Sequence, residues 1–462
     1  MIESGFAILF WGFLILYGVA MYAMSPQAVT LSSFFRGTDN QGRPASEWAL
    51  TCSIFISWIF AKSVTNAANL GAIYGAVGGL AYATYWLSIP LAGAVIYRLR
   101  TRHGAKGLVS FLTERYGRLA ALAFSAAILI RLFNEVWSNT SVVGAYYGRS
   151  GDSAFIIAAL LFTAVTLFYS LKGGLRSSIA TDVVQAILFV VVMAAVLFLV
   201  LPQHGVGTLL ATGSFTLTGG VDLVLVALLQ VLSYPFHDPV LTDRGFITEA
   251  KGMLRAYIVA GVLGFICIFA FSLVGVHARF DGLPLGDNMP GAVARAFGVL
   301  PYLLMTAVMV VAAGSTLDST FASVSKSVGQ ELPVLAGRSA SANAIRVGMW
   351  TMVVFAIAGN LPMIAGTDIL KATTVSGTMV MGLAPVFLLS PLVRHSPWSF
   401  HLAFWPGIVL GLLLAVNRIP ASWAIGGGKY ALLLGVNLYG LAICTAGFLI
   451  PVAARKLRGA AS

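Results

Sequence analysis

Apolar runs of about twenty residues alternate along the chain with short polar segments that hold most of its charge. A helix of that length spans about 30 Å of hydrocarbon, so each run predicts a transmembrane helix. We predict thirteen such segments, at 5–24, 48–75, 76–97, 120–147, 154–171, 179–201, 221–240, 256–276, 299–324, 347–364, 370–393, 403–416 and 430–453. The first has neither a basic region before it nor a small-residue cleavage site, which favours a helix over a signal peptide.

Composition supports this interpretation. Of the 462 residues, 58% are hydrophobic and only 10% are charged, which a soluble core does not explain. The sequence therefore predicts an all-α integral membrane protein whose surroundings are a lipid bilayer.

The net charge of +12 is explained by how Lys and Arg are distributed between the loops. If the N-terminus is outside, 20 of the 28 Lys and Arg residues, Arg244 among them, fall in cytoplasmic segments and 5 in outer loops. This bias follows the positive-inside rule. It predicts a multi-pass protein of the cell inner (plasma) membrane with a cytoplasmic C-terminus, and it indicates no nucleic-acid partner.

A polar cluster interrupts the apolar segment 299–324. Ser315, Thr316, Asp318 and Ser319 place three hydroxyls and a carboxylate within little more than one helical turn. Lipid offers such groups no hydrogen-bond partners, so they must face protein or a cavity. Their oxygens suit a hard cation, which predicts an ion site. Hydroxyls can instead bond to carbonyls one turn earlier, but that alternative does not account for Asp318.

The charged residues inside the predicted spans include Lys62, Arg131, Glu135, Asp182, Asp318 and Lys371. Lys62 is too far from either helix end to reach the interface, so it needs an anionic partner or ligand. Lys371 lies near a helix end, where it can reach the interface.

Arg131 and Glu135 are four residues apart and share one helical face, followed by Ser138. They are either a structural ion pair or part of a solute site, and the polar stripe that they begin is typical of a cavity wall.

Two predicted spans contain signals for a helix break. Pro235 and Pro239 each remove a backbone donor at the end of 221–240, beside Tyr234. The span 48–75 continues into a segment rich in Asn and Gly that includes Asn66. Broken helices in corresponding halves of a transporter mark its binding site, and these two spans are five apart, as two inverted five-helix repeats require. The glycines could instead form a packing face.

Several motifs together resemble the sodium/solute symporter family, which has the LeuT-type fold. The segment Gly173–Gln185, GGLRSSIATDVVQ, is similar to a signature of that family. Further similarities lie at Ala312 with Ser315 and Thr316, at Gly71 with Tyr74, and around residues 110–117.

The resemblance implies a 5+5 inverted repeat with about 13 transmembrane helices. The expected divisions are an extra N-terminal helix and cytoplasmic loop (1–46), a first repeat (47–202), a second repeat (203–394), and two C-terminal helices with a short tail (395–462). It also implies Na⁺-coupled symport of a small organic solute by alternating access, with a monomer sufficient for transport.

Ion ligands follow from the same resemblance. Ala312, Ser315 and Thr316 would hold Na⁺ with two carbonyls of the broken helix, near Trp58 and Ala61. A second Na⁺ in some members implies a further set here: Asp182, Ser315, Asp318 and Ser319.

Lys62 and Asp318 depart from the family pattern, and an added cation beside an added anion suggests that they pair. Such a pair could preserve the sodium site. The ammonium of Lys62 could equally replace the ion, making transport proton-linked or uncoupled from Na⁺.

The expected solute site comprises Lys62, Asn66, Arg131, Glu135, Ser138, Tyr234 and Ser376. A free Lys62 or Arg131 would favour a carboxylate, and a free Glu135 as well would favour an amino acid. A transporter-like sensor is the alternative class. No histidine–carboxylate or nucleophile–base constellation points to an enzyme, and no organic cofactor is expected.

Overall fold

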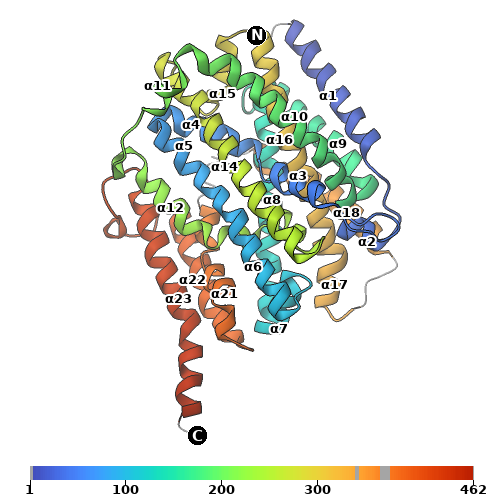
Figure 1. Ribbon diagram of the computed structural model, residues 1–462, viewed down its shortest axis with the longest axis vertical. Helices are drawn as coiled ribbons and strands as arrows, with labels where there is room; N and C mark the ends of the chain where they lie inside the picture. Colours follow the sequence, from blue (N-terminus) through green and yellow to red (C-terminus); the bar gives the residue numbers. More distant parts are fainter. Residues whose placement is uncertain (1–3, 339–342, 365–374, 461–462) are drawn as a thin grey trace.

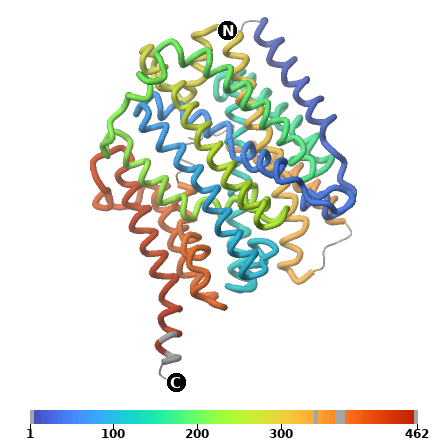
Figure 2. Tube along the Cα trace, viewed as in Figure 1, coloured from blue at the N-terminus to red at the C-terminus, as the bar shows by residue number. Residues whose placement is uncertain are grey.

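The computed structural model describes residues 4–338, 343–364 and 375–460, and this part of the chain is a bundle of helices (Figure 1). The N- and C-termini lie at opposite ends of the bundle, and α23 extends beyond its neighbours at the C-terminal end (Figure 2). Lys371 and the start of the predicted span 370–393 lie outside the described residues.

Ten helices in the described residues are long and apolar enough to cross a membrane, or eleven if one bent pair counts as a span. Their elements are α1 (Ser4–Met24), α5 (Ala76–Ala83) continuing into α6 (Ser88–His103), α8 (Arg118–Tyr147), α9 (Ser153–Gly173), α10 (Leu175–Val200), α14 (Ala250–Phe280), α16 (Val299–Lys326), α18 (Ala344–Ala358), α22 (Pro397–Ala415) and α23 (Ala431–Ala460). The predicted number of thirteen is therefore not confirmed.

The difference arises where predicted spans are interrupted. Segment 48–75 is the bent pair, formed by α3 (Glu47–Ser57) and α4 (Ala61–Tyr74) at 55°. Segment 221–240 breaks at its prolines into α12 (Val221–Val231), the 3₁₀ turn Tyr234–His237 and α13 (Pro239–Thr242). The described part of 370–393 is divided into helical residues 375–379, a turn, α21 (Leu383–Leu388) and the 3₁₀ turn Ser390–Leu392.

Shorter helices connect the spans at both ends of the bundle. They are α2 (Leu31–Arg36), α7 (Leu108–Tyr116), α11 (Val206–Leu210), α15 (Met289–Ala296), α17 (Leu332–Leu335) and α19 (Leu361–Ile364).

The first helix break lies before the glycine-rich segment. Residues 58–60 separate α3 from α4 although they include neither Gly nor Pro, and α4 runs without interruption through Asn66 and Gly71. A Cβ at Gly71 would lie 2.2 Å from the carbonyl oxygen of Ser272 in α14. The glycines of α4 thus let two helix backbones approach closely, as the packing alternative proposed.

α16 is the central helix. It packs against α3, α4, α8 and α10, and nearly every residue from Met305 to Ser325 is buried. A buried helix that carries hydroxyls and a carboxylate must satisfy them through its neighbours, and these neighbours build the site.

Candidate functional site

Four buried charged side chains form a connected group, here called the charge tetrad: Lys62, Arg131, Glu135 and Asp238. Lys62 Nζ donates to Glu135 Oε1 at 2.5 Å, and Arg131 pairs with the same carboxylate. Arg131 Nη2 also donates to Asp238 Oδ2 at 3.0 Å. Two cations face two anions, so the tetrad is charge-balanced, and it joins α4 and α8 to the proline-broken segment after α12.

Neighbouring polar groups donate or accept further hydrogen bonds with the side chains of the charge tetrad. Ser138 accepts a second hydrogen bond from Lys62 Nζ at 3.0 Å, and Asn139 donates to Glu135 Oε2 at 3.0 Å. Trp58 Nε1 donates to Asp238 Oδ2, also at 3.0 Å. The structure therefore contains the Arg131–Glu135 pair that the sequence suggested, but it places it in a larger network.

The expected pair between Lys62 and Asp318 is wrong. Asp318 Oδ2 accepts from Tyr169 at 3.0 Å and from Thr181 at 3.2 Å, because this face of α16 packs on α9 and α10. Lys62 lies in the first turn of α4 and its ammonium points to α8 instead.

A small cavity of about 20 Å³ adjoins the tetrad. Its lining consists of Trp58, Phe60, Lys62, Ser63, Tyr82, Tyr85, Trp86 and Tyr234. A space of this size holds about one water molecule. An organic solute can enter only if these elements separate.

The predicted solute residues take different positions around this cavity. Lys62 and Tyr234 line it, and Arg131 lies over the Tyr234 ring at 5.4 Å from its centroid. Asn66 donates to the Tyr82 hydroxyl at 3.2 Å. Ser376 is 3.5 Å from His237 Nε2, outside the lining.

Sequence reasoning missed the aromatic wall. Five of the lining residues that it did not assign to the solute site are aromatic: Trp58, Phe60, Tyr82, Tyr85 and Trp86. The available signal was the cluster of aromatic residues at 82–86, which lies a few residues after the helix that carries Lys62 and Asn66.

The hydroxyls of α16 meet the first helix break. Thr316 Oγ1 lies 3.4 Å from the Ser57 carbonyl at the end of α3 and 3.1 Å from the carbonyl of Ala312. Ser315 Oγ donates to Asp182 Oδ1 at 2.5 Å. Hydroxyl and carbonyl oxygens are the donors that a hard monovalent cation requires, so this group is chemically suited to Na⁺.

The other two residues expected at this ion site flank the break. Trp58 caps α3, and Ala61 is the first residue of α4, where its carbonyl accepts from Thr65 at 3.1 Å. The carbonyl that contacts Thr316 is that of Ser57, one residue before Trp58.

A buried arginine occupies the centre of the second expected ion set. Arg244 Nη2 donates to Asp182 Oδ2 at 3.0 Å and to Ser319 Oγ at 2.7 Å, and Nε donates to Ser53 at 2.6 Å. Sequence analysis counted Arg244 among the cytoplasmic loop charges, but it is fully buried because the segment after α13 turns into the bundle.

The structure does bring the second set together. Ser315 contacts Asp182, and Ser319 Oγ lies 3.3 Å from Asp318 Oδ1. The Ser178 hydroxyl of α10 lies 2.9 Å from the Ser319 hydroxyl of α16, so it links these two helices. In this arrangement the guanidinium supplies the positive charge that Asp182 requires.

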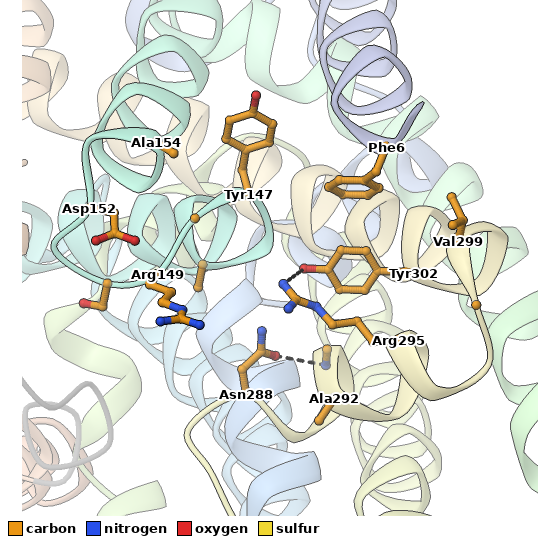
Figure 3. Close-up of a pocket in the computed structure, with 15 residues that line it drawn as sticks. Phe6, Tyr147, Arg149, Asp152, Ala154, Asn288, Ala292, Arg295, Val299 and Tyr302 are labelled. Atoms are coloured by element: carbon orange, nitrogen blue, oxygen red, sulfur yellow. Dashed lines mark hydrogen bonds between the residues drawn. The ribbon is translucent and has the colours of Figure 1, made fainter. Parts of the chain in front are cut away.

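A larger cavity, about 900 Å³, lies elsewhere, between the end of α8, the start of α9 and the α15–α16 region (Figure 3). There Arg295 donates to the Tyr302 hydroxyl at 2.7 Å, and the Gly291 amide donates to Asn288 at 3.0 Å. Its lining includes none of the predicted site residues, so we place the candidate site at the two helix breaks instead.

Known proteins resemble this chain over most of its length. No family model matches the sequence. Sodium/glucose cotransporter 1 of Mus musculus is 22% identical over 483 aligned residues, which cover 90% of this chain and 71% of that protein. The sodium/myo-inositol cotransporter of Bos taurus is 23% identical over 182 residues, or 39% of this chain and 25% of that protein.

Solved structures show the same fold. A substrate-bound, outward-open Na⁺-coupled sialic acid symporter superposes with a TM-score of 0.72 at 17% identity, covering 97% of this chain and 98% of that one. MhsT in complex with L-phenylalanine gives a TM-score of 0.54 at 13% identity, covering 88% and 98%. The chain is thus a multi-pass membrane protein with the LeuT-type fold, and it is similar to sodium/glucose and sodium/myo-inositol cotransporters.

Proposed function

We propose that this protein is a secondary active transporter that couples uptake of a small organic solute to Na⁺ by alternating access. The observation that carries the proposal is the contact between the Thr316 hydroxyl and the Ser57 carbonyl at the break between α3 and α4. This contact places the Thr316 hydroxyl of the central helix at the end of α3, where the helix breaks, and the adjacent Ser315 hydroxyl contacts Asp182. The cotransporter relatives support the same activity.

Ion coupling follows from which elements the oxygens belong to. Na⁺ held by Ala312, Ser315 and Thr316 together with carbonyls of the break would tie α16 to the bent pair α3–α4. If Na⁺ binds one arrangement of α16 and the bent pair more tightly than the others, it increases the population of that arrangement. A solute that binds the same arrangement then binds more tightly when Na⁺ is present, which couples the two binding events. Low cytoplasmic Na⁺ would release both.

The solute is proposed to bind at the aromatic cavity beside the charge tetrad. Lys62 and Arg131 are both paired with carboxylates, so the condition on which sequence analysis favoured a carboxylate or an amino acid is not met in this structure. Aromatic walls suit the apolar faces of a ring. We therefore favour a neutral ring-bearing solute, in line with the glucose and myo-inositol of the relatives' names.

Replacement of Na⁺ by the ammonium of Lys62, the alternative left open by the sequence, finds no support in the contacts. Lys62 Nζ bonds to Glu135 and Ser138, whereas the α16 hydroxyls bond to Ser57, Ala312 and Asp182.

The remaining parts of the proposal come from sequence. They are the division into 1–46, 47–202, 203–394 and 395–462, a plasma-membrane location with the N-terminus outside, a monomer as the transporting unit, and the absence of enzymatic activity. The positions of the two termini at opposite ends of the bundle agree with this topology (Figure 1).

Uptake into proteoliposomes tests the function directly. We would compare labelled sugars, polyols, carboxylates and amino acids with an inward Na⁺ gradient, an inward H⁺ gradient or neither. We expect accumulation of a neutral ring solute only with Na⁺, and its loss in Ser315→Ala and Thr316→Ala. Thr306→Val is the matched control, because this buried α16 hydroxyl bonds to Tyr302 of its own helix. Uptake driven equally well without Na⁺ would refute the coupling, and accumulation of a carboxylate alone would refute the solute class.

A further inference from the structure

Three metal-ligating side chains, those of His204, His277 and Asp281, meet where α10 and α14 end. His204 follows the 3₁₀ turn Leu201–Gln203 at the end of α10, and His277 and Asp281 are four residues apart at the end of α14. One ligand atom from each lies within 4.8 Å of the others. In the described part of the chain, no other group of three His, Cys, Asp or Glu residues meets this criterion.

Their geometry is close to that of a coordination site. Asp281 uses both carboxylate oxygens: Oδ1 lies 2.7 Å from His204 Nε2 and Oδ2 lies 3.0 Å from His277 Nε2. The two imidazole rings are 4.7 Å apart between centroids, and the Phe280 ring stacks on His204 at 5.1 Å. Ligands of one tetrahedral Zn²⁺ are roughly 3.3 Å apart, given bond lengths of 2.0–2.2 Å. Small rotations of these side chains would therefore bring the three ligand atoms to the spacing of a tetrahedral zinc site.

His277 provides an independent indication of a ligand. Its side chain is fully buried, its Nε2 faces Asp281 Oδ2 at 3.0 Å, and its Nδ1 makes no hydrogen bond with a described residue. A buried polar group without a partner is costly, and each such group calls for an explanation. An ion at this site would give His277 a coordinate bond in place of its contact with Asp281. The His204 and Asp281 side chains are 27% and 33% exposed, so an ion can reach the site from solvent.

We propose that His204, His277 and Asp281 form a binding site for a divalent transition-metal ion of the Zn²⁺ class. Two imidazoles and one carboxylate suit zinc and its neighbours rather than Mg²⁺ or Ca²⁺, which prefer all-oxygen sites. Three protein ligands leave one position for water. The ion would fasten the end of α10 to the end of α14, two helices that also pack against each other.

Metal titration of the purified full-length protein tests this site without any transport assay. We expect saturable binding of one Zn²⁺ per chain by calorimetry, a higher unfolding temperature with ZnCl₂, and neither effect with MgCl₂. Loss of a group that only hydrogen-bonds to a metal ligand already weakens metal sites about 10- to 100-fold, so loss of a ligand itself in His204→Ala or Asp281→Asn should lower the affinity by at least about tenfold.

His401→Ala is the matched control, since this histidine lies in α22 and contacts Trp405. It should bind Zn²⁺ as the unchanged protein does. If the unchanged protein shows no saturable binding, or if His204→Ala and Asp281→Asn bind Zn²⁺ with undiminished affinity while eluting as folded protein on gel filtration, the metal site is refuted. Because the readout is binding, either result is independent of whether the proposed transport activity holds.

Discussion

Arg244 Nη2 lies 3.0 Å from Asp182 Oδ2, and both side chains are fully buried at the contact of α3, α10 and α16. Removing one partner from a buried ion pair leaves an uncompensated charge, which costs about 3–5 kcal/mol. We expect Arg244→Met to lower the unfolding temperature in detergent strongly. Adding Asp182→Asn should recover part of that loss, because the second change removes the stranded charge.

The exposed pair between Arg255 and Glu47 offers the control for this experiment. Exposed ion pairs contribute little, so Arg255→Gln should leave the unfolding temperature nearly unchanged. Equal effects of Arg244→Met and Arg255→Gln would contradict the structural role assigned to Arg244.

The charge tetrad predicts a compensating pair of substitutions. Lys62→Met leaves Glu135 with one cation fewer and should reduce both the yield of folded protein and the uptake rate. Lys62→Met combined with Glu135→Gln restores the charge balance and should recover yield relative to the single change. The protein that does fold should keep its Na⁺ dependence, measured as uptake against Na⁺ concentration. A shift from Na⁺ to pH dependence in Lys62→Met would show that the lysine takes part in ion coupling.

The aromatic cavity predicts a selective effect on solute affinity. Tyr234 lines the cavity and lies at the proline-broken segment. Aromatic contacts contribute about 0.5–1.5 kcal/mol, so Tyr234→Ala should raise KM for a ring solute roughly 2- to 10-fold. Tyr439→Ala, at a residue that is 43% exposed on α23, should leave KM unchanged. An unaltered KM in Tyr234→Ala would place the solute elsewhere.

Close backbone packing between α4 and α14 predicts that Gly71 tolerates no side chain. A Cβ there would lie 2.2 Å from a backbone oxygen, which cannot rotate away. Overpacking typically costs about 1–3 kcal/mol, and we expect Gly71→Ala to lower the unfolding temperature accordingly. Gly12→Ala in α1 is the control, because no atom lies within 4 Å of its Cβ position. Similar unfolding temperatures for the two variants would argue against this packing.

The sequence predicted most of the long helices and the central polar cluster because both depend on local pattern. Hydropathy alone identifies a span, and Ser315 and Thr316 are conspicuous in an apolar helix. Pro235 and Pro239 likewise predicted the second helix break, which follows α12. The first break, at 58–60, has no such signal, since tertiary packing rather than Gly or Pro interrupts the helix there.

Partners of charged residues were harder to predict. Lys62 could have met Asp182, Asp318 or Glu135, and only the rotation of α4 against α8 selects Glu135. Arg244 resembles any arginine of a short basic loop, and its burial depends on how the segment after α13 turns into the bundle. Such choices rest on contacts between residues far apart in sequence, which local pattern does not encode.

The charge tetrad also constrains how the chain can be inserted during synthesis. Lys62 belongs to the bent pair α3–α4, whereas its partner Glu135 belongs to α8, made later. One charge at the bilayer centre costs about 2.5 kcal/mol or more. The bent pair is therefore a poor substrate for independent release into lipid. We expect it to stay beside the insertion machinery until α8 emerges, so that these helices leave together and the neutral pair, rather than either charge, enters the hydrocarbon.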